Sequence, residues 1–504
     1  MDRKRILLID PPFYRLFKET FSLVKYPLSL GYLAAAVRMH TDWDVLVYNG
    51  DFSPVSEPLE MTYLTGQGFQ NYLKCLKDLS GKVWQEIRTV VSEYDPAVVG
   101  ISAKSPTFAS VRAVASLVKK VDAGTTVVVG GPHPTVVGSR VLDCPDIDVC
   151  VVGEGEKTLI DLLRAFENQI ELAGVRGIFY RQGGRAVATL PRESVKDLDA
   201  LGFPHQFAPE VLRDYVRYPL KAFRHIFATR GCPRNCFFCG SREMWGRRVR
   251  FRSPENVAQE IKSLQNKGLK FVHFDDDMFG VNSRYLRALS KEILDRCPGI
   301  HWSCETHVRL ISRENVSFMK AAGCYMIQLG VESGNDRILS EIRKGFTIKE
   351  ALEACEVVNR HDISLETFFM AGFPQETRET LRDTLRAIER IDCDKVVYSI
   401  FTPYPGTEAF DFCRKKGLID DSYDASLHNH QSPANCFCLR IAPEQFRALS
   451  ARIEQAVDEK NRLGRARKVE RYSRLLGPDF SAGTPPVRRD QALKVSKILP
   501  SVGL

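Results

Sequence analysis

A chain of 504 residues is too long for one ordinary hydrophobic core, so its length predicts two or three domains. Hydrophobic residues make up 44% of the chain and charged residues 26%, which is typical of a globular protein and excludes a disordered one. The net charge of +9 is modest for this length and is not focused in one patch, so we expect no nucleic acid as a partner.

No early segment has the pattern of a signal peptide, and no run approaches the ~18 apolar residues that a membrane span needs. We therefore expect a cytoplasmic protein with no membrane span. Thiols stay reduced in that compartment. Most of the 14 cysteines stand singly in apolar stretches, where we expect small buried hydrophobic residues.

From about residue 5 to residue 185, short β-branched runs alternate with helical patterns, which predicts an open, mostly parallel sheet. Several runs end in Gly, Pro, Asp or Ser, where such folds place their ligand loops. A helix is expected between Pro27 and Arg38, because its apolar residues recur with i, i+3, i+4 spacing. An insert at 53–87 either caps a pocket or forms a surface helical excursion. The expected strands are 6–9, 45–48, 97–101, 126–129 and 149–152.

A second series of strands and helices extends from about His225 to Pro403 and predicts six βα units. Six such units form an incomplete barrel, whose functional groups belong at the carboxyl ends of its strands. Ser253 and Pro254 are expected as the N-cap and first residue of a helix. Residues 443–466 have a helical pattern. The expected strands are 225–230, 271–275, 301–305, 325–330, 365–371 and 396–401.

Three cysteines with C-x₃-C-x₂-C spacing follow the first of these strands, at Cys232, Cys236 and Cys239. Three thiolates on one tight loop can bind three irons of a [4Fe–4S] cluster, which normally takes four cysteines. The fourth iron is then open to a small molecule, as in a catalytic zinc site with one free position. The alternative is a structural zinc loop, but no fourth Cys or His lies within the loop, and the next His is His273.

This spacing, with the aromatic Phe238 before the last cysteine, resembles the signature of radical S-adenosylmethionine enzymes. In that family the open iron binds the amino and carboxylate groups of S-adenosylmethionine, and an electron from the cluster cleaves the cofactor to a 5′-deoxyadenosyl radical. The resemblance continues at four later strand ends, in 274–279, 330–334, 370–377 and 403–407. It implies S-adenosylmethionine contacts at Phe238, Asp276, Asp277, Arg309, Glu332, Ser333 and Gly372.

The N-terminal sheet resembles the cobalamin-binding domain that precedes the radical core in one large subgroup of that family. Glycines there would let the backbone approach a bulky planar ligand. The loop 10–15 contains no His, so the resemblance implies cobalt without a protein His from that loop; it also lacks the G-x-G-x-x-G of a dinucleotide fold. The implied cobalamin contacts are Pro12, Ser102, Gly130, Gly131, His133, Gly153 and Glu154.

The predicted fold class is α/β, with a flavodoxin-like (Rossmann-type) cobalamin-binding domain, a partial (β/α)6 radical core of the TIM type and a helical C-terminal region. We expect the cobalamin-binding domain at 1–190, a linker at 191–220 and the radical core at 221–415. The helical region follows at 416–476. A basic, Pro- and Gly-rich tail at 477–504 is expected to be disordered.

The resemblance implies a cobalamin-dependent C-methyltransferase that uses methylcobalamin and a 5′-deoxyadenosyl radical to methylate an unactivated carbon. The alternative is radical ring formation, ring contraction or another rearrangement on the same scaffold. A methylthiotransferase would need a further set of clustered cysteines, and a corrinoid carrier would leave the cysteine loop unexplained. The implied cofactors are a [4Fe–4S] cluster, S-adenosylmethionine and cobalamin. We expect a small-molecule substrate, such as a lipid or tetrapyrrole, and an electron donor such as flavodoxin or ferredoxin.

Overall fold

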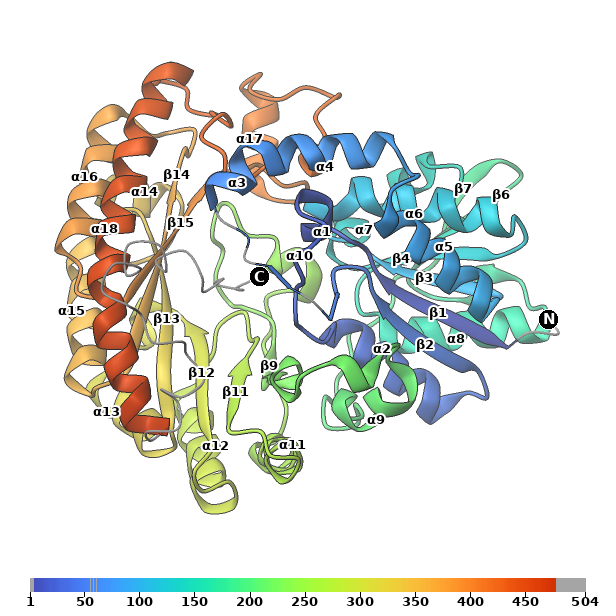
Figure 1. Cartoon of the computed structure of the whole chain (residues 1–504), viewed down its shortest axis with the longest axis horizontal. Coiled ribbons are helices and arrows are strands. Elements are labelled where there is room, and N and C mark those ends of the chain that lie inside the picture. Colours follow the sequence, from blue (N-terminus) through green and yellow to red (C-terminus); the bar gives the residue numbers. More distant parts are fainter. Residues whose placement is uncertain (1–3, 55, 58, 60, 477–504) are drawn as a thin grey trace.

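The structure is a computed structural model that describes residues 4–54, 56–57, 59 and 61–476. A seven-stranded N-terminal sheet and a six-stranded sheet lie side by side, each covered by helices (Figure 1). The predicted fold class is confirmed: two α/β units with parallel strands are followed by a helical C-terminal region. The predicted tail at 477–504 lies outside the described residues.

The N-terminal sheet has the strand order β2-β1-β3-β4-β5-β6-β7, and its first five strands are parallel. The order 2-1-3-4-5 is that of flavodoxin-like folds, which bind ligands outside the carboxyl ends of the strands. All five predicted strands are present. The antiparallel hairpin of β6 and β7 was not predicted, because its outer strand is short and largely exposed. The strands are β1 Arg5–Asp10, β2 Asp44–Asn49, β3 Val98–Ser102, β4 Thr126–Gly130, β5 Val149–Val151, β6 Ile178–Gln182 and β7 Arg185–Ala188.

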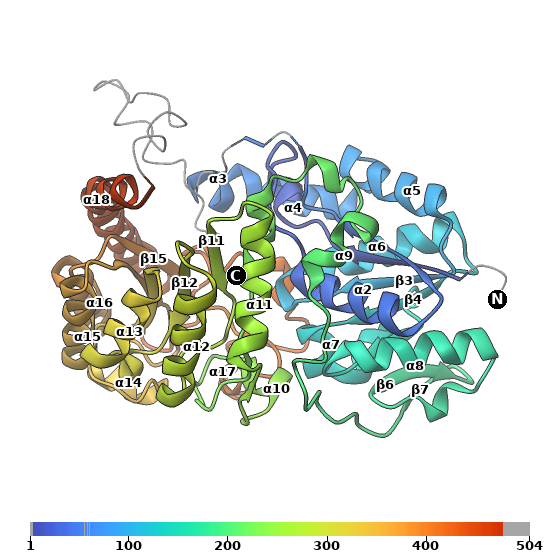
Figure 2. The ribbon, with the colours of Figure 1, turned by 90° about the horizontal axis from the view of Figure 1, so that it is seen from below.

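Helices cover both faces of this sheet (Figure 2). The predicted helix at 27–38 is present as α2, and its buried alanines and leucines pack on the strands. The insert forms α3 and α4, and Tyr72 on α4 donates a hydrogen bond of 2.7 Å to the Ser426 carbonyl, so the insert contacts the C-terminal region. The helices are α1 Tyr14–Phe17, α2 Leu28–His40, α3 Met61–Thr65, α4 Gln67–Lys77, α5 Lys82–Tyr94, α6 Phe108–Val121, α7 Pro132–Val137 and α8 Gly155–Asn168.

The second sheet has the order β15-β14-β13-β12-β11-β8, with all neighbours parallel, as an open barrel requires. The predicted first strand at 225–230 is divided. Its second half, β9, leaves the sheet and pairs antiparallel with β10. The buried Asp276 carboxylate accepts hydrogen bonds from the Ala228 amide and the Thr229 hydroxyl, which anchors the chain at this break. The strands are β8 His225–Ile226, β9 Thr229–Arg230, β10 Arg250–Phe251, β11 Phe271–Phe274, β12 His301–Thr306, β13 Cys324–Glu332, β14 Ser364–Ala371 and β15 Lys395–Ile400.

Most helices after the first barrel strand lie outside the second sheet (Figure 1), whereas the helix Pro204–Val211 packs against α2 of the N-terminal unit. Ser253 caps α11 as predicted, accepting a hydrogen bond from the Asn256 amide. The C-terminal helix α18 covers the edge strand β15, where Asn461 bonds both the amide and the carbonyl of Val396. The helices are α9 Pro204–Val211, α10 Ser241–Trp245, α11 Pro254–Asn266, α12 Ser283–Arg296, α13 Arg313–Ala321, α14 Asp336–Glu341, α15 Ile348–Arg360, α16 Arg378–Arg390, α17 Glu408–Lys415 and α18 Pro443–Leu476.

One buried apolar cluster includes residues of both units, among them Leu30 and Val47 of the N-terminal unit and Phe223 and Ile226 of the second. The two units therefore share a continuous core and do not meet through a solvated seam. Within the described part of the chain, no helix has both the length and the apolar character needed to cross a bilayer.

Candidate active site between the two sheets

The cysteine loop lies between β9 and α10, at the side of the barrel that faces the N-terminal unit (Figure 1). Its backbone is fixed through Phe237, whose amide donates to the Ile342 carbonyl and whose carbonyl accepts from the Ala409 amide. The Phe237 ring is buried, whereas Cys239 is exposed. The loop is therefore anchored at its centre, with Cys232 and Cys236 half-buried and Cys239 exposed.

The three thiols fit an iron–sulfur cluster better than a single zinc ion. All three are free of disulfides. Three thiolates can each bind one iron of a [4Fe–4S] cluster and leave the fourth iron open, whereas a structural zinc site takes four protein ligands. The donor set therefore fits the cluster that the spacing predicts.

A buried ion pair borders the cysteine loop. Lys344 Nζ lies 3.1 Å from Glu332 Oε1, and both side chains are at most 10% exposed. Gly330 makes room for this pair, because a side chain there would begin 2.5 Å from Glu332 Oε1. Burial raises the pKa of Cys236, and the positive charge of Lys344 opposes that effect. Lys344 thus supplies a positive charge where thiolates would gather, a role that sequence reasoning missed because no motif marks the residue.

The other predicted S-adenosylmethionine contacts are placed differently, and their roles remain predictions. Asp277 is exposed next to the loop, close enough for its charge to act on Cys239. Asp276 is buried below and is already bonded to Ala228 and Thr229. Burial raises the pKa of Asp276 to about 7.

Arg309 and Ser333 have protein partners in this structure, and their contact with S-adenosylmethionine remains a prediction. Arg309 is half exposed and pairs with Glu350 on α15, at 3.5 Å. Ser333 is fully buried, and its hydroxyl lies 3.3 Å from that of Thr384 on α16.

Phe238 and Gly372 come together from opposite ends of the barrel sequence. The Phe238 ring packs on Phe373 with centroids 5.6 Å apart. The Gly372 and Phe373 amides both donate to Glu376 Oε2, at 2.6 and 3.0 Å. Glu376 is fully buried, and burial raises its pKa to about 8. This turn at the end of β14 is thus held rigidly beside the residue that precedes Cys239.

On the N-terminal side, glycines follow β4 and β5. Gly131 has φ +119°, and a side chain there would begin 2.8 Å from the Ala103 carbonyl oxygen. Gly153 has φ +78°, and a side chain there would meet no atom within 4 Å. Gly130 has only Val151 near it, at 3.5 Å. Gly130 and Gly153 thus leave open space beside the backbone, which fits a bulky planar ligand such as the predicted corrin, whereas Gly131 is required by its close approach to Ala103.

The remaining predicted cobalamin contacts already have protein partners. The Pro12 carbonyl accepts a hydrogen bond of 2.6 Å from the Ser110 hydroxyl. Ser102 is the last residue of β3, beside these loops. His133 Nδ1 lies 3.0 Å from Ser105 Oγ, and its ring packs on Phe108 at 4.1 Å. Burial lowers the pKa of His133 to about 4, so its ring is neutral at pH 7. Their contact with cobalamin remains a prediction.

Glu154, the last predicted cobalamin contact, bridges the two units, and its contact with cobalamin remains a prediction. Its carboxylate accepts hydrogen bonds from Arg230 and Arg250, each at 2.7 Å, and from the Val195 amide at 2.6 Å. Burial alone would raise the pKa of Glu154, but the bonds from Arg250 and Arg230 lower it. Sequence analysis missed Arg230 because the partners in this contact are far apart in the chain.

A second polar contact between the units lies at the end of β11. Lys25 of the N-terminal unit lies 3.0 Å from Asp275, which also bonds His225 Nδ1 at 2.8 Å and has His273 Nε2 at 3.6 Å. These side chains are close enough together to bind a metal ion, but the Lys25 ammonium already neutralises Asp275. We therefore assign no metal here.

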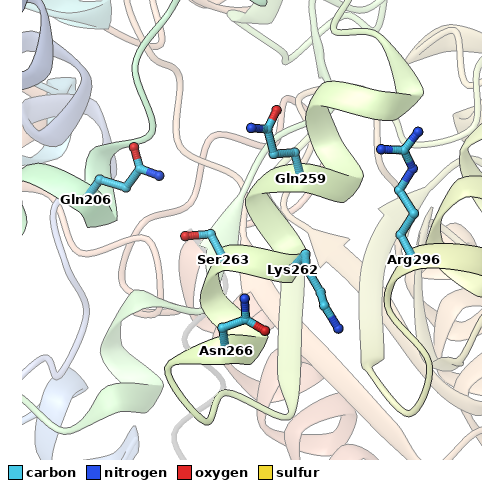
Figure 3. Close-up of a pocket in the computed structure, with 6 residues that line it drawn as sticks. All are labelled: Gln206, Gln259, Lys262, Ser263, Asn266 and Arg296. Carbon is cyan, nitrogen blue, oxygen red and sulfur yellow. The ribbon is translucent and has the colours of Figure 1, made fainter.

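The pocket shown in Figure 3 lies between α9, α11 and α12, away from the cysteine and glycine loops. It has a volume of about 370 Å³ and is lined by polar side chains from the outer face of α11 and from the neighbouring α9 and α12. None of these side chains comes from the carboxyl end of a strand, so we assign the pocket no part in the chemistry. They are Gln206, Gln259, Lys262, Ser263, Asn266 and Arg296.

Comparison with known families agrees with both halves of this site. A model of the radical SAM superfamily matches residues 226–388, and a model of the B12 binding domain matches residues 15–163. The uncharacterized methyltransferase PH0819 of Pyrococcus horikoshii is 30% identical over 418 residues, which is 82% of this chain and 84% of that protein. The chain therefore belongs to the family of radical S-adenosylmethionine enzymes with a cobalamin-binding domain, and its cofactors are a [4Fe–4S] cluster, S-adenosylmethionine and cobalamin.

Other relatives carry different activities. The anaerobic magnesium-protoporphyrin IX monomethyl ester cyclase of Cereibacter sphaeroides is 29% identical over 359 residues, or 69% of this chain and 58% of that protein. Among solved structures, the methyltransferase TsrM of Kitasatospora setae superposes with a TM-score of 0.68 at 16% identity, covering 94% of this chain and 99% of TsrM. The radical enzyme OxsB superposes at 0.61 with 17% identity, covering 98% of this chain and 70% of OxsB. At these identities the solved structures support the fold alone.

Proposed function

We propose that this cobalamin-dependent radical S-adenosylmethionine enzyme transfers a methyl group to an unactivated carbon of a small-molecule substrate. The observation that carries the proposal is the contact between the base of the cysteine loop and the glycine loop after β5, through Arg230 and Glu154. Because these loops touch, groups bound to each would face one another. When bound, the cluster supplies the electron that cleaves S-adenosylmethionine, and cobalamin supplies the methyl group.

The residues of the chain bind, orient and balance charge. Cys232, Cys236 and Cys239 would hold three irons and leave the fourth for the amino and carboxylate groups of S-adenosylmethionine. Lys344 would offset the negative charge of the thiolates, and its pairing with Glu332 fixes its ammonium in place. Gly130 and Gly153 would leave the cobalamin face free of side chains.

Two methyltransferase relatives cover more of this chain than the cyclase relatives do, which favours methyl transfer over rearrangement. PH0819 covers more of this chain than the cyclases do, and the cytidylyl-2-hydroxyethylphosphonate methyltransferase of Streptomyces wedmorensis is 23% identical over 83% of the chain. Radical ring formation is the second candidate, because the cyclase of Cereibacter sphaeroides is 29% identical. Lipids and tetrapyrroles remain our proposed substrate classes, and flavodoxin or ferredoxin our proposed electron donor.

The two candidate reactions, methyl transfer and rearrangement, can be distinguished without the substrate. Protein reconstituted without oxygen with iron, sulfide and cobalamin is reduced and mixed with methyl-labelled S-adenosylmethionine. A methyltransferase forms about one S-adenosylhomocysteine per bound cobalamin, with the label on cobalt. Deoxyadenosine without S-adenosylhomocysteine would contradict methyl transfer and favour rearrangement. The Cys236→Ala variant should bind cobalamin but lose its iron and its deoxyadenosine formation.

A further inference from the structure

Arg230 occupies the junction between the two halves of the site. It ends β9, two residues before Cys232, and is 7% exposed. Its Nη1 lies 2.7 Å from Glu154 Oε1, and its Nη2 lies 2.6 Å from Glu156 Oε1. Both glutamates belong to the segment that follows β5 and that also contains Gly153. One guanidinium therefore joins the start of the cysteine loop to the glycine loop of the N-terminal unit.

Glu154 is held from a second direction. Arg250 lies opposite Arg230 in the β9–β10 pair, and its Nη1 lies 2.7 Å from Glu154 Oε2 and 2.6 Å from the Val195 carbonyl. The Val195 amide donates to the same Glu154 oxygen at 2.6 Å. Both oxygens of Glu154 are thus engaged, which fixes the orientation of its carboxylate.

Aromatic rings close around the Arg230 guanidinium. The rings of Tyr32, Phe227 and Trp245 have their centroids 5.6, 4.8 and 5.3 Å from its central carbon. Tyr32 belongs to α2 of the N-terminal unit, whereas Trp245 lies on α10, directly after the cysteine loop. Arg230 therefore touches the chain at both ends of that loop. Next to this contact, Thr135 on α7 approaches Met244 on α10, with Oγ1 and Sδ 3.6 Å apart.

This arrangement favours a role in geometry over a role in stability alone. Burying several charges costs desolvation, so an apolar interface would stabilise the contact at least as well. A planar fork that bonds two carboxylates fixes both distance and angle, which a flexible ammonium does not. The ion pairs therefore fit a contact whose geometry has to be kept.

We propose that Arg230 is a positioning residue that, through Glu154 and Glu156, sets the separation and orientation of the cysteine loop relative to the glycine loop after β5. The proposal rests on the proposed function only for the identity of the two bound cofactors. Arg230 touches no reacting group in this scheme, and it acts by keeping the two loops in register.

The first test uses protein without cofactors. Arg230→Lys keeps the charge and loses the fork, and Glu156→Gln removes one arm of the contact while leaving Glu154 intact. Arg471→Lys is the matched control, because Arg471 on α18 also joins two carboxylates, those of Asp362 at 3.1 Å and Asp394 at 2.5 Å, and lies outside both loops. In the first two variants we expect about tenfold faster exchange of the backbone amides at 153–156, at 231–239 and at Val195. In the control, these amides should exchange at the parental rate.

The second test measures the geometry in the loaded enzyme. Spin–spin interaction between the reduced cluster and cobalt(II) should weaken and broaden in Arg230→Lys. Iron content, cobalamin stoichiometry and substrate-free deoxyadenosine formation should stay within twofold of the parent. Unchanged exchange and unchanged spin coupling would overturn the proposal, as would an equal disturbance in Arg471→Lys.

A third variant keeps the proposal testable if Arg230→Lys does not fold. Arg230→Met combined with Glu156→Gln leaves no buried charge without a partner, because Glu154 keeps its ion pair with Arg250. Faster exchange at the two loops in that variant would support the proposal, and parental exchange would overturn it. Should exchange respond while the parent takes up no cobalt, the positioning contact would stand and the proposed function would fail.

Discussion

The two sides of the site differ in how the chain prepares them. On the barrel side, reactive groups are side chains: three thiols, with the Lys344–Glu332 pair buried beside them. On the N-terminal side, the strand ends carry Gly131 and Gly153, and the nearby His133 ring and Glu154 carboxylate already have protein partners. One side would therefore act through charge and ligand chemistry, and the other through space left free of side chains. We therefore expect the barrel side to lose function when a charged or ligand side chain is removed. We expect the N-terminal side to lose function when a side chain is added at a glycine.

The largest effect should follow loss of the Lys344 charge. Lys344→Met leaves Glu332 buried without a partner, which we expect to lower the free energy of unfolding by about 3–5 kcal/mol. The reduction potential of the cluster should also fall, because a positive charge beside its ligands is lost. Urea unfolding and redox titration measure the two effects.

Lys468→Met provides the matched control. Lys468 forms an ion pair with the buried Glu366 on β14, and it lies on α18, outside the cysteine loop. This variant should lose stability while the cluster keeps its potential. An equal shift of potential in both variants would show that Lys344 acts only through the fold.

Gly131→Ala should have the next largest effect, now by adding atoms. The φ of +119° disfavours any side chain, and the new Cβ would meet the Ala103 carbonyl oxygen at 2.8 Å. We expect a loss of about 1–3 kcal/mol in the free energy of unfolding. Cobalamin uptake should weaken too, while iron content is kept. Parental stability in this variant would show that the loop after β4 has more freedom than described.

Gly153→Leu tests the free space more directly. A side chain at this position meets nothing in the protein, so it should enter the space assigned to cobalamin. We expect at least 30-fold weaker cobalamin binding, or about 2 kcal/mol, with normal deoxyadenosine formation. Gly183→Leu is the control, because Gly183 also has a positive φ of +58° and an open environment, but lies at the β6–β7 turn. Equal loss of binding in both variants would contradict the assignment of this space.

The same contrast explains what could be predicted from the sequence. The cysteine loop was found because its ligands are close in sequence, and the strands were found because their β-branched runs are strong. Lys344 and Arg230 were missed, since a lysine 12 residues after Glu332 and an arginine 76 residues from Glu154 have no local pattern. The division of the first barrel strand was missed for the same reason, because it depends on the distant Asp276. Long-range polar contacts of this kind exist only once the fold has formed.

The smallest expected effect concerns pH and the His133 ring. Burial lowers the pKa of His133 to about 4, and the charges that face it are Asp424, which raises the pKa, and Arg112 and Arg140, which lower it. The unfolded chain takes up a proton near pH 6.5 and the folded chain only near pH 4. The stabilisation is therefore present at pH 7 and is lost as the pH falls between these values.

In the parent, lowering the pH from 7 to 5.5 should therefore remove about 1 kcal/mol of the free energy of unfolding through His133. His133→Gln should lose that part of the pH dependence, because Gln does not titrate and can still bond Ser105, which lies 3.0 Å from the His133 ring. Urea unfolding of cofactor-free protein at the two pH values measures the difference. An unchanged dependence would assign it to another group. If instead His133 contacted cobalamin, His133→Gln would lose cobalamin affinity at pH 7, where the stability argument predicts little change. Measuring stability and cobalamin affinity in this variant therefore distinguishes the two roles.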